Sequence, residues 1–122
     1  MRMVLIHAIM DAILGASGLG DIGQHFPDSD LTFKNAKSRD LLTDVIRLVE
    51  SKKFKIINID ATIICQSPKL SEFIPKMIEN ISVNCKCESS QVNIKATTTE
   101  MMGFIGRSEG IAAQCSCLIE SF

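Results

Sequence analysis

Four clusters of polar residues stand where the sequence predicts a helix or a strand to end, and sites are usually built at such ends. Threonine hydroxyls can donate hydrogen bonds to phosphate oxygens, and a glutamate oxygen is a ligand that suits a hard divalent cation. Both residue types meet in the last cluster, so its chemistry suits a phosphate group and a metal ion. The clusters are His7 with Asp11, Gly20-Asp21-Ile22-Gly23 leading into Phe26-Pro27-Asp28-Ser29-Asp30, Gln66-Ser67-Pro68-Lys69, and Thr97-Thr98-Thr99-Glu100.

Each of these candidates also has an ordinary structural explanation. Glu100 can be a solvated charge at a strand end, and the three threonines before it can be β-formers that end a strand. Asp21 has glycines near it, so it can accept hydrogen bonds from a ribose diol that approaches the backbone closely, but aspartate is also common in turns. The residues alone leave both interpretations open.

The composition restricts the class of protein. The chain has 122 residues and 13.4 kDa, which predicts one domain over residues 1–122. Its net charge of -1 gives no field to hold nucleic acid or an anionic membrane, and its six aromatic residues are all Phe, so surfaces for stacking bases are scarce. The longest apolar run, Met3 to Ile6, is far shorter than the ~18 residues of a membrane helix. We therefore expect an unprocessed cytoplasmic globular protein without nucleic-acid or membrane partners.

The five cysteines are an odd number in a chain for which we expect a reducing compartment, so free thiols are expected. Two pairs, Cys85 with Cys87 and Cys115 with Cys117, could make a four-thiolate zinc site. Their spacing is shorter than the two to four residues that usually separate paired zinc ligands. Small buried or surface thiols are the interpretation we favour.

Hydrophobic spacing and turn residues predict three helices, over residues 4–16, 38–52 and 71–81, and three strands, over 55–66, 91–96 and 111–120. Ser38 is expected to cap the second helix, and Pro75 fits only in the first turn of the third. The expected buried residues are Leu5, Ile9, Ala12, Ile13 and Ala16 in the first helix, Leu41, Val45, Leu48 and Val49 in the second, and Ile57, Ile59, Ala61 and Ile63 in the first strand.

Helices and strands in this order predict an α+β fold, with a small mixed sheet and helices packed on one face. A sheet of only three strands leaves edges and a bare face. We therefore expect a further strand, an oligomer, or both. Residues 26–37 predict a surface loop of a length that is usually functional, and His25 before it is expected to be solvated.

Taken together and in order, the polar clusters resemble the 2-C-methyl-D-erythritol 2,4-cyclodiphosphate synthase family of the non-mevalonate isoprenoid route. The resemblance runs from His7 to the C-terminus, at the family's spacing. It rests on H-A-I-M-D-A-I-L-G-A, G-D-I-G-Q-H-F-P-D-S-D, Q-S-P-K, and K-A-T-T-T-E followed by G-F-I-G-R-S-E-G-I-A. Each block alone is weak, but the ordered set is specific.

The resemblance implies a homotrimer with active sites between neighbouring subunits. It implies a small-molecule cytidine diphosphate substrate whose own 2-phosphate attacks the β-phosphate, so that CMP leaves and no protein nucleophile is needed. Glu100 would hold Mg²⁺ or Mn²⁺ between the α- and β-phosphates, and Thr98 would stabilise the transition state as a catalytic residue. Lys69 would act near the diphosphate, and Asp21 would bind the ribose.

The implied substrate-binding set includes a loop over residues 65–70 that surrounds the cytosine, largely through backbone groups. Residues 26–30 would form a mobile loop over the methylerythritol phosphate, with Asp28 on a sugar hydroxyl. The full set is Asp21, Ile22, Gly23, Phe26, Pro27, Asp28, Ser29, Asp30, Cys65, Gln66, Ser67, Pro68, Lys69, Leu70, Thr97, Thr98, Thr99, Glu100, Phe104 and Arg107.

Phe104, Arg107 and Glu109 match residues that line a cavity on the family's trimer axis, where an isoprenoid diphosphate can sit. The alternative is an interface ion pair beside an aromatic ring. The sequence does not choose between these two roles.

The match fails upstream of His7. The family's zinc-type site, which takes zinc or manganese, adds an Asp-x-His pair to the histidine at this position, but Met1 to Ile6 contain no carboxylate and no histidine. A single imidazole is not a metal site, because three protein ligands are usual. The chain is then either an N-terminally truncated synthase or a degenerate homologue that binds nucleotide or isoprenoid diphosphates without catalysis. We expect truncation, because every downstream motif residue is intact.

Overall fold

The computed structural model describes residues 2–27 and 37–122. In chain order the elements are α1 (Arg2–Ala16), α2 (Ile22–His25), α3 (Ser38–Ser51), β1 (Phe54–Ile64), the 3₁₀ turn η2 (Ser71–Phe73), α4 (Ile74–Cys85), the 3₁₀ turn η3 (Ser89–Gln91), β2 (Val92–Thr97), α5 (Gly103–Gly106) and β3 (Ala112–Ser121). Most of the predicted loop, residues 28–36, lies outside the described residues.

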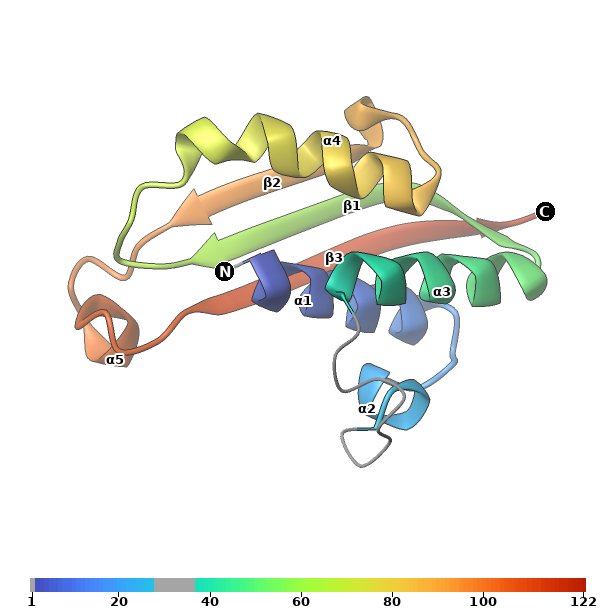
Figure 1. Cartoon of the computed structure of the whole chain (residues 1–122), viewed down its shortest axis with the longest axis horizontal. Coiled ribbons are helices and arrows are strands. Elements are labelled where there is room, and N and C mark those ends of the chain that lie inside the picture. Colours follow the sequence, from blue (N-terminus) through green and yellow to red (C-terminus); the bar gives the residue numbers. More distant parts are fainter. Residues whose placement is uncertain (1, 28–36) are drawn as a thin grey trace.

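The three strands form one mixed sheet in the order β2-β1-β3. The central strand β1 pairs parallel with β2 and antiparallel with β3. Helix α4 connects β1 to β2, and α1, α3 and α4 lie along the sheet (Figure 1). The predicted α+β class, with a small mixed sheet and a helical layer, is confirmed.

The helical layer buries a wider set of residues than the sequence predicted. Leu5, Ile9 and Ile13 of α1 are fully buried as expected, but Ala12 is half-buried and Ala16 is exposed. In α3 the expected Leu41 and Leu48 are only partly buried. The residues that take their place in the core are Ile6, Met10 and Leu14 in α1, and Leu42 and Ile46 in α3.

The error in α3 has a physical cause. Its apolar residues come as neighbouring pairs in the sequence. One member of each pair belongs to one apolar stripe along the helix and the other member to a second stripe with similar spacing, so the sequence alone does not say which stripe faces the core. Contacts of α3 with α1, α4 and β1 decide the rotation of the helix. Ser38 is likewise the first helical residue, not the cap, because Lys37 holds the cap position without a side-chain hydrogen bond.

A bulge in β1 interrupts the alternation of buried and exposed residues that the sequence predicted. The register with β3 shifts between Ile56 and Asn58, so Ile57 is an extra residue in the strand. Ile56 is buried and Ile57 is only half-buried, which reverses the prediction for this pair. From Ile59 onward the predicted alternation is confirmed. The strand ends at Ile64 rather than at Gln66.

The other face of the sheet is polar. Asp60 on β1 accepts hydrogen bonds from Lys95 Nζ at 2.9 Å and Asn93 Nδ2 at 3.1 Å, both on β2. These hydrogen bonds lower the pKa of Asp60, with the bond from Lys95 as the larger cause. Leu118 of β3 is 60% exposed.

No helix in residues 2–27 or 37–122 is long and apolar enough to cross a membrane.

Candidate functional site at the carboxyl edge of the sheet

The loops that follow β1 and β2 lie side by side, because parallel strands end at the same edge of a sheet. Cys65 N donates a hydrogen bond to Thr97 O at 2.9 Å, directly after β1 and at the last residue of β2. Two of the predicted clusters therefore meet, although they are far apart in the sequence. We call residues 65–70 and 97–101 the edge cluster.

The first half of the edge cluster is an exposed loop anchored at both ends. Cys65 and Leu70 are buried in the core, and Cys65 Sγ donates a hydrogen bond to Ser67 O at 2.8 Å. Ser67, Pro68 and Lys69 are exposed between them, and the Ser67–Pro68 peptide bond is cis. Cys65 and Leu70 can thus offer a ligand backbone groups, whereas Lys69 offers its ammonium group.

The three threonines differ in what their hydroxyl groups do. Thr99 Oγ1 donates to Met102 O at 2.6 Å, and Thr97 Oγ1 donates to Thr98 O over a longer distance of 3.4 Å. Thr98 Oγ1 accepts a hydrogen bond from Glu100 N at 3.1 Å, which leaves its own O–H able to donate. Among the three, exposed Thr98 is the best placed to donate to a phosphate.

Glu100 lies in a turn with an unusual backbone. Glu100 has φ 54° and Met101 has φ 66°, so two consecutive residues with side chains adopt the left-handed region, which costs on the order of 1–3 kcal/mol each. Met101 N donates to Gln66 Oε1 at 3.0 Å, and Met102 N donates to Thr99 O at 3.0 Å. These bonds hold the turn that directs the exposed Glu100 carboxylate.

Asp21 belongs to a second group of residues, around α1 and α2. It is the N-cap of α2 and accepts a hydrogen bond from Gln24 N at 3.0 Å, while Asp11 Oδ1 accepts from Ile22 N at 2.9 Å. Gly20 has φ 90°, a backbone conformation that residues with a side chain rarely adopt, so this position favours glycine. The capping roles of Asp11 and Asp21 were not predicted, although Asp at a helix start is a recognisable signal.

Two histidines complete this second group. His25 is half-buried, and its Nε2 lies 2.7 Å from Leu19 O, which corrects the prediction of a solvated histidine. His7 is half-buried on α1. No group of three His, Cys, Asp or Glu residues that could hold a metal ion occurs in the described part of the chain. His7 with its described neighbours therefore does not fit a three-ligand zinc or manganese site.

All five cysteines are free in the described structure, and only Cys65 belongs to the edge cluster. Cys85 is buried, and Cys87, Cys115 and Cys117 are half-buried. Burial raises the pKa of all four thiols, and it raises that of Cys115 to about 12. These groups are therefore thiols, not thiolates, at neutral pH.

A third group of residues lies in α5 and in the segment that directly follows it. Arg107 and Glu109 form a bidentate ion pair, with Nε to Oε1 at 3.0 Å and Nη2 to Oε2 at 3.2 Å. Phe104 is 55% exposed. The Arg107–Glu109 pair lies within one chain, so both predicted roles, an interface ion pair and an isoprenoid cavity, stay predictions. Figure 1 shows that α2 lies away from the tips of the β1 and β2 arrows, so a single chain does not bring Asp21 to the edge cluster.

Comparison with known proteins decides the family. A family model described as the YgbB family matches residues 3–120. The chain belongs to the YgbB family. It is 54% identical over 119 residues to a 2-C-methyl-D-erythritol 2,4-cyclodiphosphate synthase of Methylobacillus flagellatus, covering 98% of this chain and 74% of the relative. A synthase of the same name from Geobacter metallireducens is 55% identical over 117 residues, again with 74% of the relative covered. The predicted resemblance is confirmed.

Solved structures of the YgbB family share the fold. The bifunctional IspDF of Campylobacter jejuni matches with a TM-score of 0.94 and 48% identity, over 98% of this chain and 32% of that one. The CDP complex of IspF from Plasmodium falciparum matches with a TM-score of 0.86 and 35% identity, over 97% of this chain and 70% of that one. Sequence identities of 48% and 35% indicate a family relationship and not only a shared fold.

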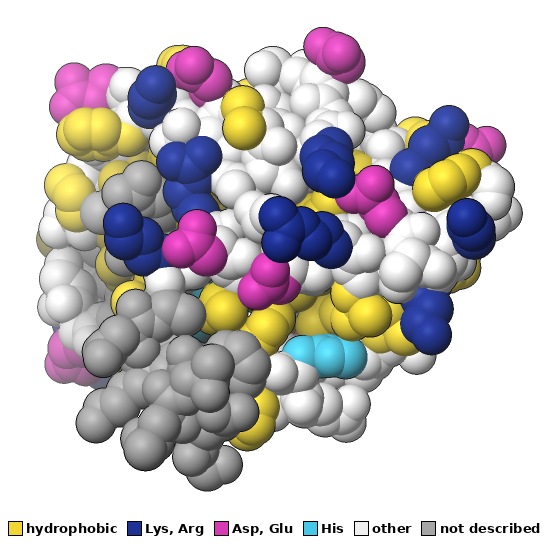
Figure 2. All heavy atoms as spheres, turned by 45° about the vertical axis from the view of Figure 1, so that its right-hand side comes forward, with side chains coloured by type: hydrophobic (Ala, Val, Ile, Leu, Met, Phe, Trp, Pro, Cys, Tyr) yellow, Lys and Arg dark blue, Asp and Glu magenta, His cyan; other side chains and the backbone are white. Residues whose placement is uncertain are grey.

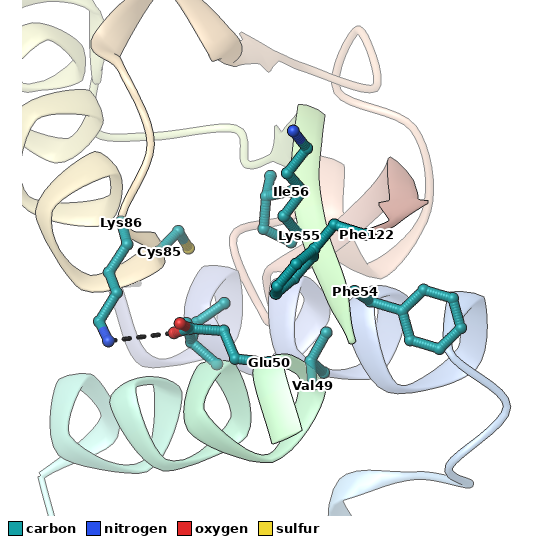
Figure 3. A pocket seen from close by; sticks show the side chains of 9 residues that line it. Val49, Glu50, Phe54, Lys55, Ile56, Cys85, Lys86 and Phe122 are labelled. Carbon is teal, nitrogen blue, oxygen red and sulfur yellow. Dashed lines mark ion pairs between the residues drawn. The ribbon is translucent and has the colours of Figure 1, made fainter. Parts of the chain in front are cut away.

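A hollow of about 230 Å³ is lined by residues at the start of β1, whereas the edge cluster follows the end of this strand; Figure 3 shows the side chains that line the hollow. It is lined mainly by apolar side chains, among them Phe54, Ile56 and Phe122. Lys86 Nζ lies 3.0 Å from Glu50 Oε1, and Lys55 Nζ lies 3.7 Å from Glu120 Oε2, so both lysines have acidic partners. Both lysines that line this hollow are therefore paired with carboxylates and are not free to bind a diphosphate.

The surface charge agrees with the composition. On the face drawn in Figure 2, lysine and arginine side chains are interspersed with aspartate and glutamate. This face carries no extended patch of one sign. Together with the net charge of -1, this distribution gives an anionic ligand that approaches this face little long-range attraction.

Proposed function

We propose that this chain is the cyclodiphosphate synthase subunit that its relatives' names describe. In the reaction, an oxygen of the substrate's 2-phosphate forms a bond to the β-phosphorus, the bond from that phosphorus to the bridging oxygen breaks, and CMP leaves with that oxygen. The observation that carries the proposal is the edge cluster, which joins the Q-S-P-K and T-T-T-E motifs in a chain 54% identical to a synthase.

Within the edge cluster we assign roles by the geometry of each group. Backbone groups of residues 65–70 enclose the cytosine, and the exposed Lys69 ammonium neutralises charge on the diphosphate. Thr98 donates its hydroxyl proton to a phosphate oxygen as negative charge develops there. Ser67 and Thr97 contribute exposed polar groups at the rim, while Thr99 maintains the turn through its bond to Met102 O.

Glu100 fits a divalent cation that arrives with the substrate. Mg²⁺ in phosphate sites is usually held by one or two carboxylates together with phosphate oxygens, and Glu100 supplies one exposed carboxylate beside Thr98. Mg²⁺ or Mn²⁺ there would neutralise the charge of the diphosphate. The His7 site does not fit in this way, so we assign no step to a metal ion at His7.

We propose a homotrimer in which the three groups of residues come together across subunit boundaries. Asp21, Ile22 and Gly23 would meet the ribose at the edge cluster of a neighbouring subunit, with Phe26 and Pro27 at the start of the covering loop; Asp28, Ser29 and Asp30 lie outside the described residues. The exposed apolar residues Met101, Met102 and Phe104 support an association of subunits. Phe104 and Arg107 would then line a cavity on the trimer axis.

CMP release from 4-diphosphocytidyl-2-C-methyl-D-erythritol 2-phosphate tests the proposal. The 122-residue chain is expected to bind CDP in calorimetry but to turn over slowly, because His7 lacks two of the implied ligands. A chain extended by the part of the Methylobacillus relative that lies outside the match is expected to release CMP at least a hundredfold faster. Failure of both chains to bind CDP would contradict the proposal, and equal rates would contradict the importance of the completed metal site.

The second candidate is a homologue that binds nucleotide or isoprenoid diphosphates without catalysis. Identity of 53–55% to several synthases favours the enzyme over this alternative. CDP binding by the extended chain without any CMP release would restore the alternative.

A further inference from the structure

The side chain of Gln66 joins the two halves of the edge cluster. Its Oε1 accepts the hydrogen bond from Met101 N at 3.0 Å, across 35 positions of sequence. Gln66 is half-buried, whereas Ser67, Pro68 and Lys69 after it are exposed. The Gln66 side chain is therefore directed toward the Glu100 turn.

This hydrogen bond is donated by Met101, one of the two residues of the turn whose backbone lies in the left-handed region. Met101 and Glu100 both have positive φ, a conformation that residues with a side chain adopt rarely and only when their surroundings hold it. On the other side of the turn, a Cβ on Gly106 would lie 2.1 Å from Met101 C and 2.6 Å from Met101 O. Gly106 makes room for the carbonyl group of Met101, and Gln66 anchors the N–H group of Met101.

We propose that Gln66 is a positioning residue. Through Met101 it holds Glu100 in the orientation in which the carboxylate meets the cation on the diphosphate. This inference rests on the proposed function, because it takes Glu100 as the metal ligand. It also separates Gln66 from the rest of residues 65–70, since its side chain acts on the turn and not on the cytosine.

The substitution Gln66→Met tests this role. Methionine has similar length, but its side chain does not offer an amide N–H a good acceptor, so the left-handed turn loses its anchor. The readout is the ratio of the CDP dissociation constant without Mg²⁺ to that with Mg²⁺, measured by calorimetry on the 122-residue chain. We expect Gln66→Met to lower this ratio roughly twofold to tenfold, the worth of one hydrogen bond, with the Mg²⁺-free constant little changed.

Two further variants distinguish positioning from loss of stability. Gln66→Glu keeps an oxygen that accepts from Met101 N, so it should return the ratio to the wild-type value or above. Gln91→Met is the matched control, because the Gln91 side chain likewise accepts a hydrogen bond from a backbone N–H, that of Glu88, but lies directly before β2 and away from the edge cluster. Gln91→Met should lower the melting temperature and leave the ratio unchanged.

The Glu100→Gln variant separates this inference from the proposed function. A ratio that falls in Glu100→Gln but stays at the wild-type value in Gln66→Met overturns the positioning role alone. A ratio that stays unchanged in both variants overturns the metal role of Glu100, and the inference with it. A ratio that falls equally in Gln91→Met shows a general effect of stability and also overturns the positioning role.

Discussion

The backbone N–H of Glu100 donates a hydrogen bond to the hydroxyl oxygen of Thr98 at 3.1 Å. Both residues are exposed in the turn that follows β2. The bond fixes the Thr98 oxygen relative to the Glu100 backbone, so the proposed proton donor and the proposed metal ligand belong to one local structure. Substitutions that keep or remove this bond can separate its structural role from catalysis.

Thr98→Val should lower the rate of CMP release by about a hundredfold or more, with KM nearly constant, because a donor used as charge develops is lost. The measurement is steady-state CMP release by the chain extended with the part of the Methylobacillus relative that lies outside the match. Thr98→Ser is the control, since it keeps both the donor and the acceptor for Glu100 N. A raised KM with unchanged turnover in Thr98→Val would show that Thr98 only binds substrate.

Glu100→Gln should weaken Mg²⁺-dependent CDP binding by about tenfold or more, because the amide is a poor ligand for a hard cation in place of the carboxylate. The backbone N–H that bonds Thr98 is retained, so the turn should persist. Calorimetry over a range of Mg²⁺ concentrations measures the effect. CDP binding that depends on Mg²⁺ as in the wild type would return Glu100 to a solvated charge.

Asp21→Ser should weaken CDP binding by roughly 1.5–3 kcal/mol, the value of a charge-assisted hydrogen bond to the ribose. Serine caps helices well, so this change keeps the bond to Gln24 N and removes the carboxylate. Asp21→Ala removes both and should also lower the melting temperature. Wild-type CDP affinity in Asp21→Ser would limit Asp21 to its capping role.

Mixed trimers test the sharing of the site between subunits. A chain with Asp21→Ser and a chain with Thr98→Val, both extended and refolded together, should regain CMP release at roughly a quarter of the sites by random association. Each restored site takes Asp21 from one subunit and Thr98 from its neighbour. Rates equal to the average of the two separate variants would contradict a shared site.

Asp60 should make folding stability depend on pH. Hydrogen bonds from Lys95 and Asn93 lower its pKa below the ordinary value of 3.8, so its stabilising effect is present above that pH and is lost as the pH falls through the lowered value. Urea unfolding between about pH 4 and pH 2 should show this loss in the wild type and less of it in Asp60→Asn. Lys95→Met, which removes the larger cause, should reduce the same slope. Identical pH profiles would contradict the assignment.

The sequence was sufficient where a property depends on near neighbours. The strand over β1, Pro75 in the first turn of α4 and the end of α3 before Lys53 follow from local spacing and turn residues. It was insufficient where two neighbouring apolar residues could each be the buried one, as for the two stripes of α3 or for Ile56 and Ile57 at the bulge. Packing against other elements decides such cases, because it depends on residues far away in the chain.

For the site, the motifs by themselves determined which residue types are present and the family they resemble. Only the tertiary structure joined Cys65 to Thr97 and Gln66 to Met101, and only it showed that Thr99 is engaged in the turn while Thr98 can donate. It also left Asp21 away from the edge cluster within one chain. Hydrogen bonds between loops and the left-handed turn at Glu100 depend on the parallel pairing of β1 and β2, which brings together segments that share no local signal.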